Sequence, residues 1–166
     1  MTNQTIQVAI IMGSDSDLPI VEAIFPILDS FGVKFTKNVM SAHRTPHDVM
    51  ELIKNSEENG CNVFIAAAGM AAHLAGAVAA HSTKPVIGIP IESGGMGGID
   101  SLLSTAMMPP GVPVATVAVG KSGAKNSAIL AVQILATSDD DLAKKLIEYK
   151  QNMRSEVLEK DKKLNS

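Results

Sequence analysis

The 166-residue sequence contains one cysteine, no tryptophan, one tyrosine and four phenylalanines. The single cysteine, Cys61, excludes a disulfide within the chain and is typical of a reducing compartment. Aromatic residues make up 3% of the chain and hydrophobic residues 46%, so the core must be packed from Ala, Val, Ile, Leu and the nine Met. At this length the composition predicts a single globular domain over residues 1–166.

The chain also lacks an excess of positive charge, a secretory leader and an apolar run of membrane length. The chain has fourteen Lys and Arg residues and seventeen Asp and Glu residues, whereas a nucleic-acid-binding surface needs a basic stripe. No positive charge precedes the first apolar run, and no apolar stretch reaches about 20 residues without a polar, Gly or Pro interruption. We therefore expect a cytoplasmic protein whose partners are neither nucleic acid nor membrane.

Short apolar segments without polar alternation recur along the chain, and segments with helical periodicity separate them. The apolar segments are typical of buried parallel strands, which we expect at residues 7–12, 33–40, 62–67, 85–90 and 112–119. Helices are expected at residues 18–31 (with a kink or local break at Pro26), 46–59, 71–80, 100–107 and 124–136, the fourth with Asp100 as N-cap. The alternation predicts an α/β fold: a three-layer αβα sandwich with an open parallel five-stranded sheet, flavodoxin-like, and an extra C-terminal helix at about 139–160.

This C-terminal helix carries an apolar stripe opposite a charged face. Leu142, Leu146, Tyr149, Met153 and Val157 recur at helical spacing. Because the sheet is already covered by its own helices, the stripe packs either on its own domain or on another subunit. The sequence leaves both arrangements open.

Residues 41–46 form a strand-to-helix turn that puts a histidine and an arginine beside a helix N-terminus. Thr45 is the expected N-cap and Asp48 the acidic partner of a capping box. The helix dipole and Arg44 attract anions to such a place. The same features disfavour a positive charge on His43, so we expect a largely neutral imidazole near pH 7, with a bound phosphate partly reversing this effect. The turn predicts an anionic substrate beside an acid–base histidine.

Three further turns follow expected strand ends. Residues 13–17 (Gly-Ser-Asp-Ser-Asp) are either an ordinary turn or a phosphate cradle in which Asp17 faces a ribose. His73 is either a structural or a catalytic histidine. Residues 93–98 are either a flexible glycine-rich connection or a lid. Because the carboxyl ends of parallel strands share one edge of a sheet, we expect all four turns to meet in one crevice.

Metal and dinucleotide sites are not expected from this sequence. Four dispersed histidines and one cysteine do not supply clustered metal ligands. The turn at residues 13–17 lacks the second and third glycines of the dinucleotide fingerprint. Cys61 lies at the start of a strand, away from the expected crevice, and is expected to be inert.

Three segments carry a resemblance to a known family: residues 12–17 (Met-Gly-Ser-Asp-Ser-Asp), 41–46 (Ser-Ala-His-Arg-Thr-Pro) and 68–74 (Ala-Gly-Met-Ala-Ala-His-Leu). On these motifs the chain resembles the PurE family, the N5-carboxyaminoimidazole ribonucleotide mutases of purine biosynthesis. The resemblance implies a homo-octameric mutase that moves a carboxylate from the exocyclic nitrogen of a ribonucleotide to C4 of its imidazole. It implies no metal, ATP or biotin, and a route through CO2 that is lost, trapped and added at C4.

The resemblance also implies roles for individual residues. His43 is implied as the catalytic acid–base group that moves protons between the nitrogen and C4. Ser14, Asp17 and Arg44 are implied to bind the ribose phosphate. The resemblance further implies that Ser16, Ser41 and the turn at residues 69–74, with Gly69, Ala72 and Leu74, line the rest of the pocket and that His73 lies near the carboxylate or CO2.

Two positions depart from the family pattern, and two alternative functions stay open. Met70 stands where the family has Gly, and Ala75 where it has Pro. A related branch carboxylates aminoimidazole ribonucleotide with free CO2 and typically has Lys in place of Arg44, so the arginine favours the mutase branch. A non-enzymatic phosphate- or nucleotide-binding module would explain Arg44 and the serines but would leave His43 without a role.

Overall fold

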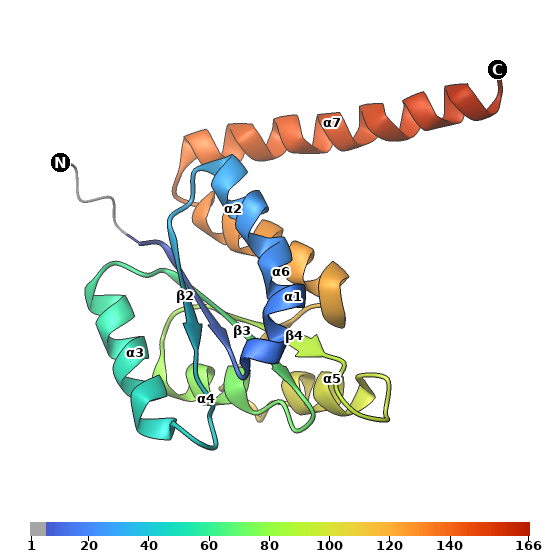
Figure 1. Ribbon diagram of the computed structural model, residues 1–166. Coiled ribbons are helices and arrows are strands. Elements are labelled where there is room, and N and C mark those ends of the chain that lie inside the picture. The colour runs from blue at the N-terminus through green and yellow to red at the C-terminus, as the bar shows by residue number, and fades with distance from the viewer. Residues whose placement is uncertain (1–5) are drawn as a thin grey trace.

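A five-stranded parallel sheet forms the centre of the computed structural model, which describes residues 6–166 (Figure 1). Its strands are β1 (Val8–Met12), β2 (Phe35–Val39), β3 (Val63–Gly69), β4 (Val86–Ile91) and β5 (Ala115–Thr116). They lie in the order β2-β1-β3-β4-β5, which is the flavodoxin-like order. The predicted α/β fold class is therefore confirmed.

The register places the carboxyl ends of the strands at one edge of the sheet. Met12, the last residue of β1, pairs with Val39 in β2 and Ala67 in β3. Strand β3 continues for two residues beyond this level, and Gly69 pairs with Ile91 at the end of β4. The segments that follow β1, β2, β3 and β4 therefore start close together.

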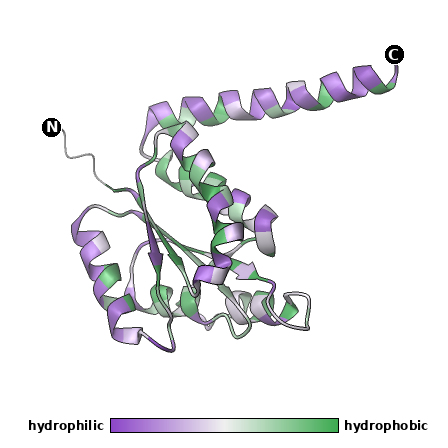
Figure 2. Cartoon of the chain, viewed as in Figure 1, coloured by the Kyte–Doolittle hydropathy of each residue, from purple (hydrophilic) through white to green (hydrophobic). Residues whose placement is uncertain are grey.

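Helices cover both faces of the sheet. One face carries α1 (Leu18–Val21), α2 (Phe25–Phe31) and α6 (Gly120–Leu135), and the other carries α3 (Pro46–Glu58), α4 (Leu74–His81) and α5 (Ile99–Ala106). Alternate residues of β1 serve the two faces: Ile10 packs into the first layer and Ile11 into the second, and both are fully buried. Burial on both faces explains why β1, β3 and β4 read as continuous apolar runs. The edge strand β2 is only partly buried and is drawn largely purple in Figure 2.

The first expected helix is broken, as Pro26 predicted. A 3-10 turn, η2 (Glu22–Ile24), separates α1 from α2. Pro26 lies in the first turn of α2, where its missing N–H removes no helical hydrogen bond. Gly32 ends α2 with a left-handed φ of 77°.

Several expected boundaries were wrong. Strand β5 has two residues instead of the eight at 112–119, because it pairs with β4 only through Ala115 and Thr116. Helix α6 begins at Gly120, four residues before the expected start. The N-cap of α5 is Gly98, with φ 80°, and not Asp100, because the chain enters this helix through a left-handed residue.

The small-residue helix α4 also starts later than expected, at Leu74 and not at residue 71. His73 is its N-cap, so the imidazole stands on the turn before the helix. A backbone hydrogen bond of 2.8 Å from the N–H of His73 to the carbonyl of Ala71 tightens this turn.

The C-terminal helix α7 (Asp140–Leu164) packs on its own domain through its first half only. Its first half packs on its own domain: Leu142 is buried, and the ring of Tyr149 lies 5.8 Å from that of Phe31. Lys145 Nζ also donates a 2.8 Å hydrogen bond to the carbonyl of Phe31. Every residue from 151 onwards is exposed, and this half projects from the body of the protein (Figure 1). Among the helices within residues 6–166, none has both the length and the hydrophobicity needed to cross a membrane.

Candidate active site

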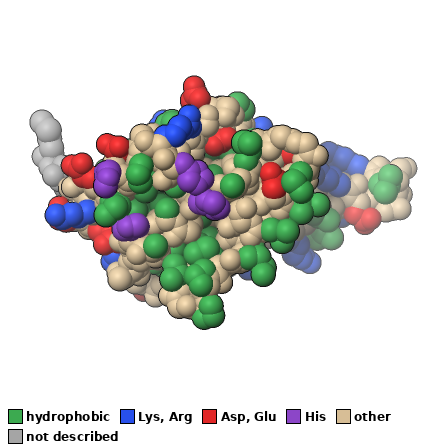
Figure 3. Space-filling view, turned by 90° about the horizontal axis from the view of Figure 1, so that it is seen from below, with side chains coloured by type: hydrophobic (Ala, Val, Ile, Leu, Met, Phe, Trp, Pro, Cys, Tyr) green, Lys and Arg blue, Asp and Glu red, His purple; other side chains and the backbone are tan. Residues whose placement is uncertain are grey.

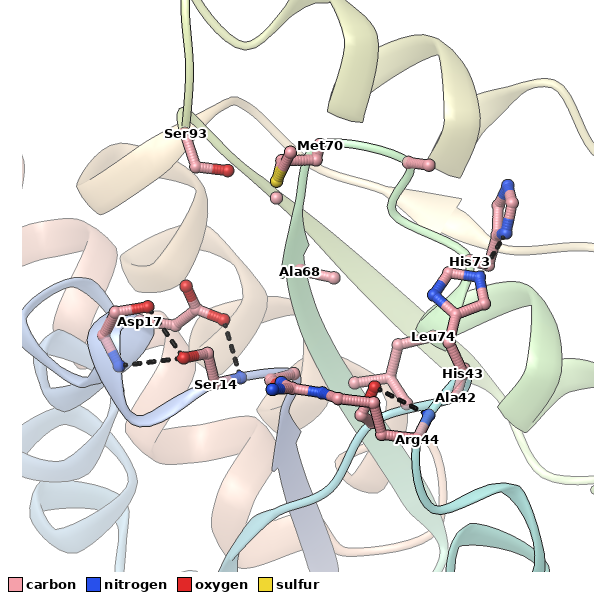
Figure 4. Close-up of a pocket in the computed structure, with 15 residues that line it drawn as sticks. Ser14, Asp17, Ala42, His43, Arg44, Ala68, Met70, His73, Leu74 and Ser93 are labelled. Carbon is pink, nitrogen blue, oxygen red and sulfur yellow. Dashed lines mark hydrogen bonds between the residues drawn. The ribbon is translucent and has the colours of Figure 1, made fainter.

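A cavity of about 560 Å³ opens at the carboxyl edge of the sheet, where four chain segments meet (Figure 4). It is lined after β1 by Gly13, Ser14, Ser16 and Asp17, after β2 by Ser41, Ala42, His43 and Arg44, at and after the end of β3 by Ala68, Gly69, Met70, Ala71, His73 and Leu74, and after β4 by Ser93. Figure 3 looks onto this end of the molecule and shows histidine side chains surrounded by apolar ones.

The turn after β1 is a short 3-10 helix, η1 (Asp15–Asp17), closed by a capping box. The side chain of Ser14 accepts a hydrogen bond from the Ser16 N–H at 3.3 Å, and Asp17 Oδ2 accepts one from the Ser14 N–H at 3.2 Å. These bonds fix both side chains at the cavity wall. The turn thus has a defined conformation, with Ser14 and Ser16 hydroxyls 2.9 Å apart.

Asp17 is a carboxyl group in a largely buried position. Its residue is 6% exposed, and burial raises the pKa of its carboxyl above the ordinary value, while the hydrogen bond from the Ser14 N–H acts in the opposite direction. Only one oxygen, Oδ2, is used by that bond. The carboxyl therefore retains acceptor capacity on the side of the cavity.

The turn after β2 is closed by Thr45, but not in the way that the sequence predicted. Thr45 is the N-cap of α3, yet its side chain makes no capping bond; its hydroxyl accepts from the Ser41 N–H at 3.0 Å and donates to the Ser41 carbonyl at 3.1 Å. The Thr45 N–H is already bonded to the Ser41 carbonyl at 2.9 Å. The expected capping box with Asp48 is therefore wrong, because the hydroxyl and the backbone N–H of Thr45, which would both be needed for the box, are already bonded to Ser41.

Arg44 links the turns after β1 and β2. Its Nη2 donates a 3.2 Å hydrogen bond to the carbonyl of Gly13, and its backbone N–H donates to Ser41 Oγ at 3.2 Å. The side chain is exposed, with one edge of the guanidinium held at the cavity floor. A guanidinium has five N–H donors, so an anion can still be bound by the remaining ones.

His43 and His73 form a pair across the cavity wall. His43 Nε2 lies 2.8 Å from His73 Nδ1, and the rings meet edge to face at 75° with centroids 4.9 Å apart. One of these nitrogens must carry the proton and the other must accept it, so the contact couples the tautomers of the two rings. Both imidazoles are exposed to the solvent that fills the cavity.

The segment that leaves β3 brings backbone and apolar groups to the site. A Cβ at Gly69 would collide with the Ser93 side chain and lie 3.1 Å from the Ile91 carbonyl, so only glycine permits this approach of the two turns. Leu74 closes the cavity from beneath with a buried side chain. Ala72 is 1% exposed and is not part of the lining.

Nine of the ten residues expected at the site therefore lie on one cavity, and Ala72 lies behind its wall. Sequence reasoning had assigned no pocket role to Ala42 or Ala68, which both line the cavity. Ser93, which also lines it, opens the glycine-rich stretch that was expected at the crevice as a connection or a lid. The two alanines carried no signal, since small apolar residues are common throughout this chain.

The remaining candidate groups lie elsewhere. Within residues 6–166, no three His, Cys, Asp or Glu side chains are grouped so that they could hold a metal ion. Cys61 is buried at the opposite end of β3, where its Sγ contacts the Val63 carbonyl at 3.3 Å, and burial raises the pKa of its thiol. A buried thiol with a raised pKa is a poor nucleophile.

Comparisons with known proteins identify the family of this chain. The sequence model for AIR carboxylase matches residues 7–156. The N5-carboxyaminoimidazole ribonucleotide mutase of Methanocaldococcus jannaschii is 52% identical over 157 residues, covering 95% of this chain and 96% of that protein. The Bacillus subtilis protein of the same name is 50% identical over 157 residues, covering 95% and 97%.

The fold comparison gives the same family. The crystal structure of Treponema denticola PurE matches with a TM-score of 0.87 at 30% sequence identity, covering 96% of this chain and 99% of that one. Sequence and structure are thus similar over nearly the full length of each relative. The chain therefore belongs to the AIR carboxylase family, the family of the PurE proteins.

Proposed function

We propose that this protein is an isomerase of purine biosynthesis that converts N5-carboxyaminoimidazole ribonucleotide to 4-carboxy-5-aminoimidazole ribonucleotide. The observation that carries the proposal is the contact between His43 and His73 in a cavity that also holds Arg44 and the capped turn at Ser14 and Asp17. An anion-binding group and an acid–base pair thus face one space, which is what proton transfer on an anionic ribonucleotide requires.

The polar groups at the floor of the cavity are suited to the ribose phosphate. Arg44 and the hydroxyls of Ser14 and Ser16 can bind phosphate oxygens. The free acceptor capacity of Asp17 is suited to a ribose hydroxyl, because a second anion beside the carboxyl would be unfavourable. The imidazole ring of the substrate would then extend toward His43 and His73 on the other side.

His43 is the group to which we assign proton transfer. The N–CO2⁻ bond of the substrate breaks with its electron pair going to nitrogen. This nitrogen takes a proton from the protonated side chain of His43, and CO2 is released. C4 of the substrate then donates an electron pair to CO2, and the proton on C4 passes to the His43 side chain, which is now neutral. Atoms and charge balance without an external oxidant or a nucleoside triphosphate. His43 gives up one proton and regains one, so it ends in its starting protonation state.

His73 is assigned to positioning and to the carboxylate. Its Nδ1 contacts Nε2 of His43, which leaves Nδ1 of His43 as the nitrogen that exchanges a proton with the substrate. The exposed ring of His73 can also donate from Nε2 to the carboxylate or CO2 when Nδ1 acts as the acceptor.

A time course by NMR tests this proposal directly. Purified protein is mixed with substrate labelled in its carboxyl group, without ATP, beside an enzyme-free control because this substrate also decays alone. Rapid appearance of label on C4 is the expected result. Product only from aminoimidazole ribonucleotide with bicarbonate would favour the carboxylase, and binding without any product would favour the phosphate-binding module.

We also propose that the chain works as a homo-oligomer, an octamer by family resemblance. Met153 and Val157 continue the apolar stripe of α7 but are 50% and 63% exposed, and Ile99 and Leu103 on α5 are 58% and 53% exposed. Apolar side chains that recur on one face of a helix and find no cover in their own chain favour contact with other subunits.

A further inference from the structure

Met70 has an unusual backbone conformation at the rim of the cavity. Its φ is +56°, and within residues 6–166 it is the only residue other than glycine with a positive φ. The left-handed region is unfavourable for a residue with a side chain, because Cβ approaches the following carbonyl. A methionine held there is a strained element next to a candidate active site.

Packing in the core does not explain this methionine. Its side chain is 64% exposed, so most of its apolar surface stays in contact with water. Glycine stands at the neighbouring position 69, where a Cβ would collide with Ser93, and not at position 70, where the backbone is left-handed. The chain therefore places a large flexible side chain at a position that glycine would occupy without strain.

The side chain of Met70 does line the cavity. In Figure 4 it extends from the turn after β3 to the side of the cavity where Ser93 lies, opposite Arg44. The left-handed backbone sets the direction in which this side chain leaves the turn. Met70 is thus the one long apolar side chain on the upper rim in this view, above the small side chain of Ala68.

We propose that Met70 covers the cavity during turnover and retains the CO2 formed there, an inference that rests on the proposed mutase reaction. After the N–C bond breaks, CO2 is uncharged and can either receive the electron pair of C4 or diffuse out. Ionic groups hold a neutral molecule weakly, so its retention depends on how well the rim is closed. A flexible thioether side chain can adapt to cover such an opening.

The test measures the fate of the carboxyl carbon. Substrate labelled with ¹³C in the carboxyl group is converted in a buffer containing unlabelled bicarbonate and carbonic anhydrase, and the label retained on C4 is read by NMR. Met70→Ala shortens the side chain and keeps the strained backbone, whereas Met70→Gly removes both side chain and strain. Met70→Leu keeps an apolar side chain of similar size, and Met50→Ala, an exposed methionine on α3 outside the cavity, is the matched control.

We expect both Met70→Ala and Met70→Gly to increase the ratio of lost to retained label by roughly tenfold, a change of about 1.4 kcal/mol in the competition between escape and capture. Met70→Leu and Met50→Ala should match the wild type. Unchanged retention of label in Met70→Ala and Met70→Gly would overturn the inference. Loss of label only in those Met70 variants whose oligomer mass has also changed would overturn it as well. Failure of the wild-type protein to place any label on C4 would instead overturn the proposed function.

Discussion

His43 Nε2 lies 2.8 Å from His73 Nδ1 although the two residues are 30 positions apart in the chain. His43 follows β2 and His73 follows β3, and these strands are separated in the sheet by β1. The pair therefore bridges the end of β1, next to the switch point between β1 and β3, where the order of the strands in the sheet reverses. Ligands of open α/β sheets bind at this switch point.

Replacement of His43 by asparagine should abolish turnover while preserving substrate binding. Asparagine keeps a polar side chain but cannot exchange a proton, so kcat should fall by about 10²–10⁴-fold with little change in Kd. Single-turnover kinetics and calorimetric titration measure the two quantities. His47→Asn removes an exposed histidine four residues away, outside the cavity, and should keep both values. Loss of binding in a folded His43→Asn protein would contradict the catalytic assignment.

Arg44→Gln should weaken the binding of substrate more than it slows the chemistry. Loss of a charge-assisted contact to phosphate should raise KM by about 10–100-fold at nearly constant kcat. Arg154→Gln removes the other arginine of the chain, on the projecting part of α7, and serves as the control. A fall in kcat at unchanged KM would argue that Arg44 acts on the reacting groups.

Asp17→Asn should stabilise the fold at neutral pH. Because burial raises the pKa of Asp17, the stability linked to its protonated form is fully present below the ordinary pKa of 3.8 and is lost as pH rises through the raised value. Asparagine stays neutral and keeps an oxygen that can accept from the Ser14 N–H. Thermal melts should show a higher Tm than the wild type at pH 7 and a smaller difference near pH 4. The same variant at exposed Asp29 should show neither effect, and a lower Tm at pH 7 would contradict the prediction.

Gly69→Ala should damage both the fold and the site. The new Cβ would collide with Ser93, so one of the two turns must shift, at a cost of about 1–3 kcal/mol in the free energy of unfolding. Gly95→Ala is the matched control for stability, since a Cβ there meets no atom within 4 Å. Denaturant titration compares the two variants, and equal stability would show that Ser93 moves aside freely.

Met153→Asp combined with Val157→Asp should reduce the mass of the assembly. Both side chains lie on the projecting half of α7, so a charge there cannot disturb the core of the same chain. Light scattering should give a mass near eight chains of 17.4 kDa for the wild type and a lower mass for the variant. Ser155→Asp on the other side of the helix is the control, and an unchanged mass in the double variant would contradict this interface.

The sequence predicted the local part of the site better than its contacts. Residues 13–17 and 41–46 were expected as strand-to-helix turns, and both are. The capping box was expected at Thr45 but occurs at Ser14 and Asp17. Both turns contain suitable side chains, and the tertiary placement of the Thr45 hydroxyl toward Ser41 decided which one formed the box.

The sequence by itself determined the fold class and the family. Apolar runs such as residues 8–12 must be buried on both sides, and only helices on both faces of a sheet provide that burial. Tertiary structure alone decided that His43 meets His73, that only the first half of α7 packs on its own domain, and that Met70 takes a left-handed backbone. The physical reason is range: hydrophobic periodicity and turn chemistry act over a few residues, whereas these contacts depend on how strands and helices far apart in the chain pack together.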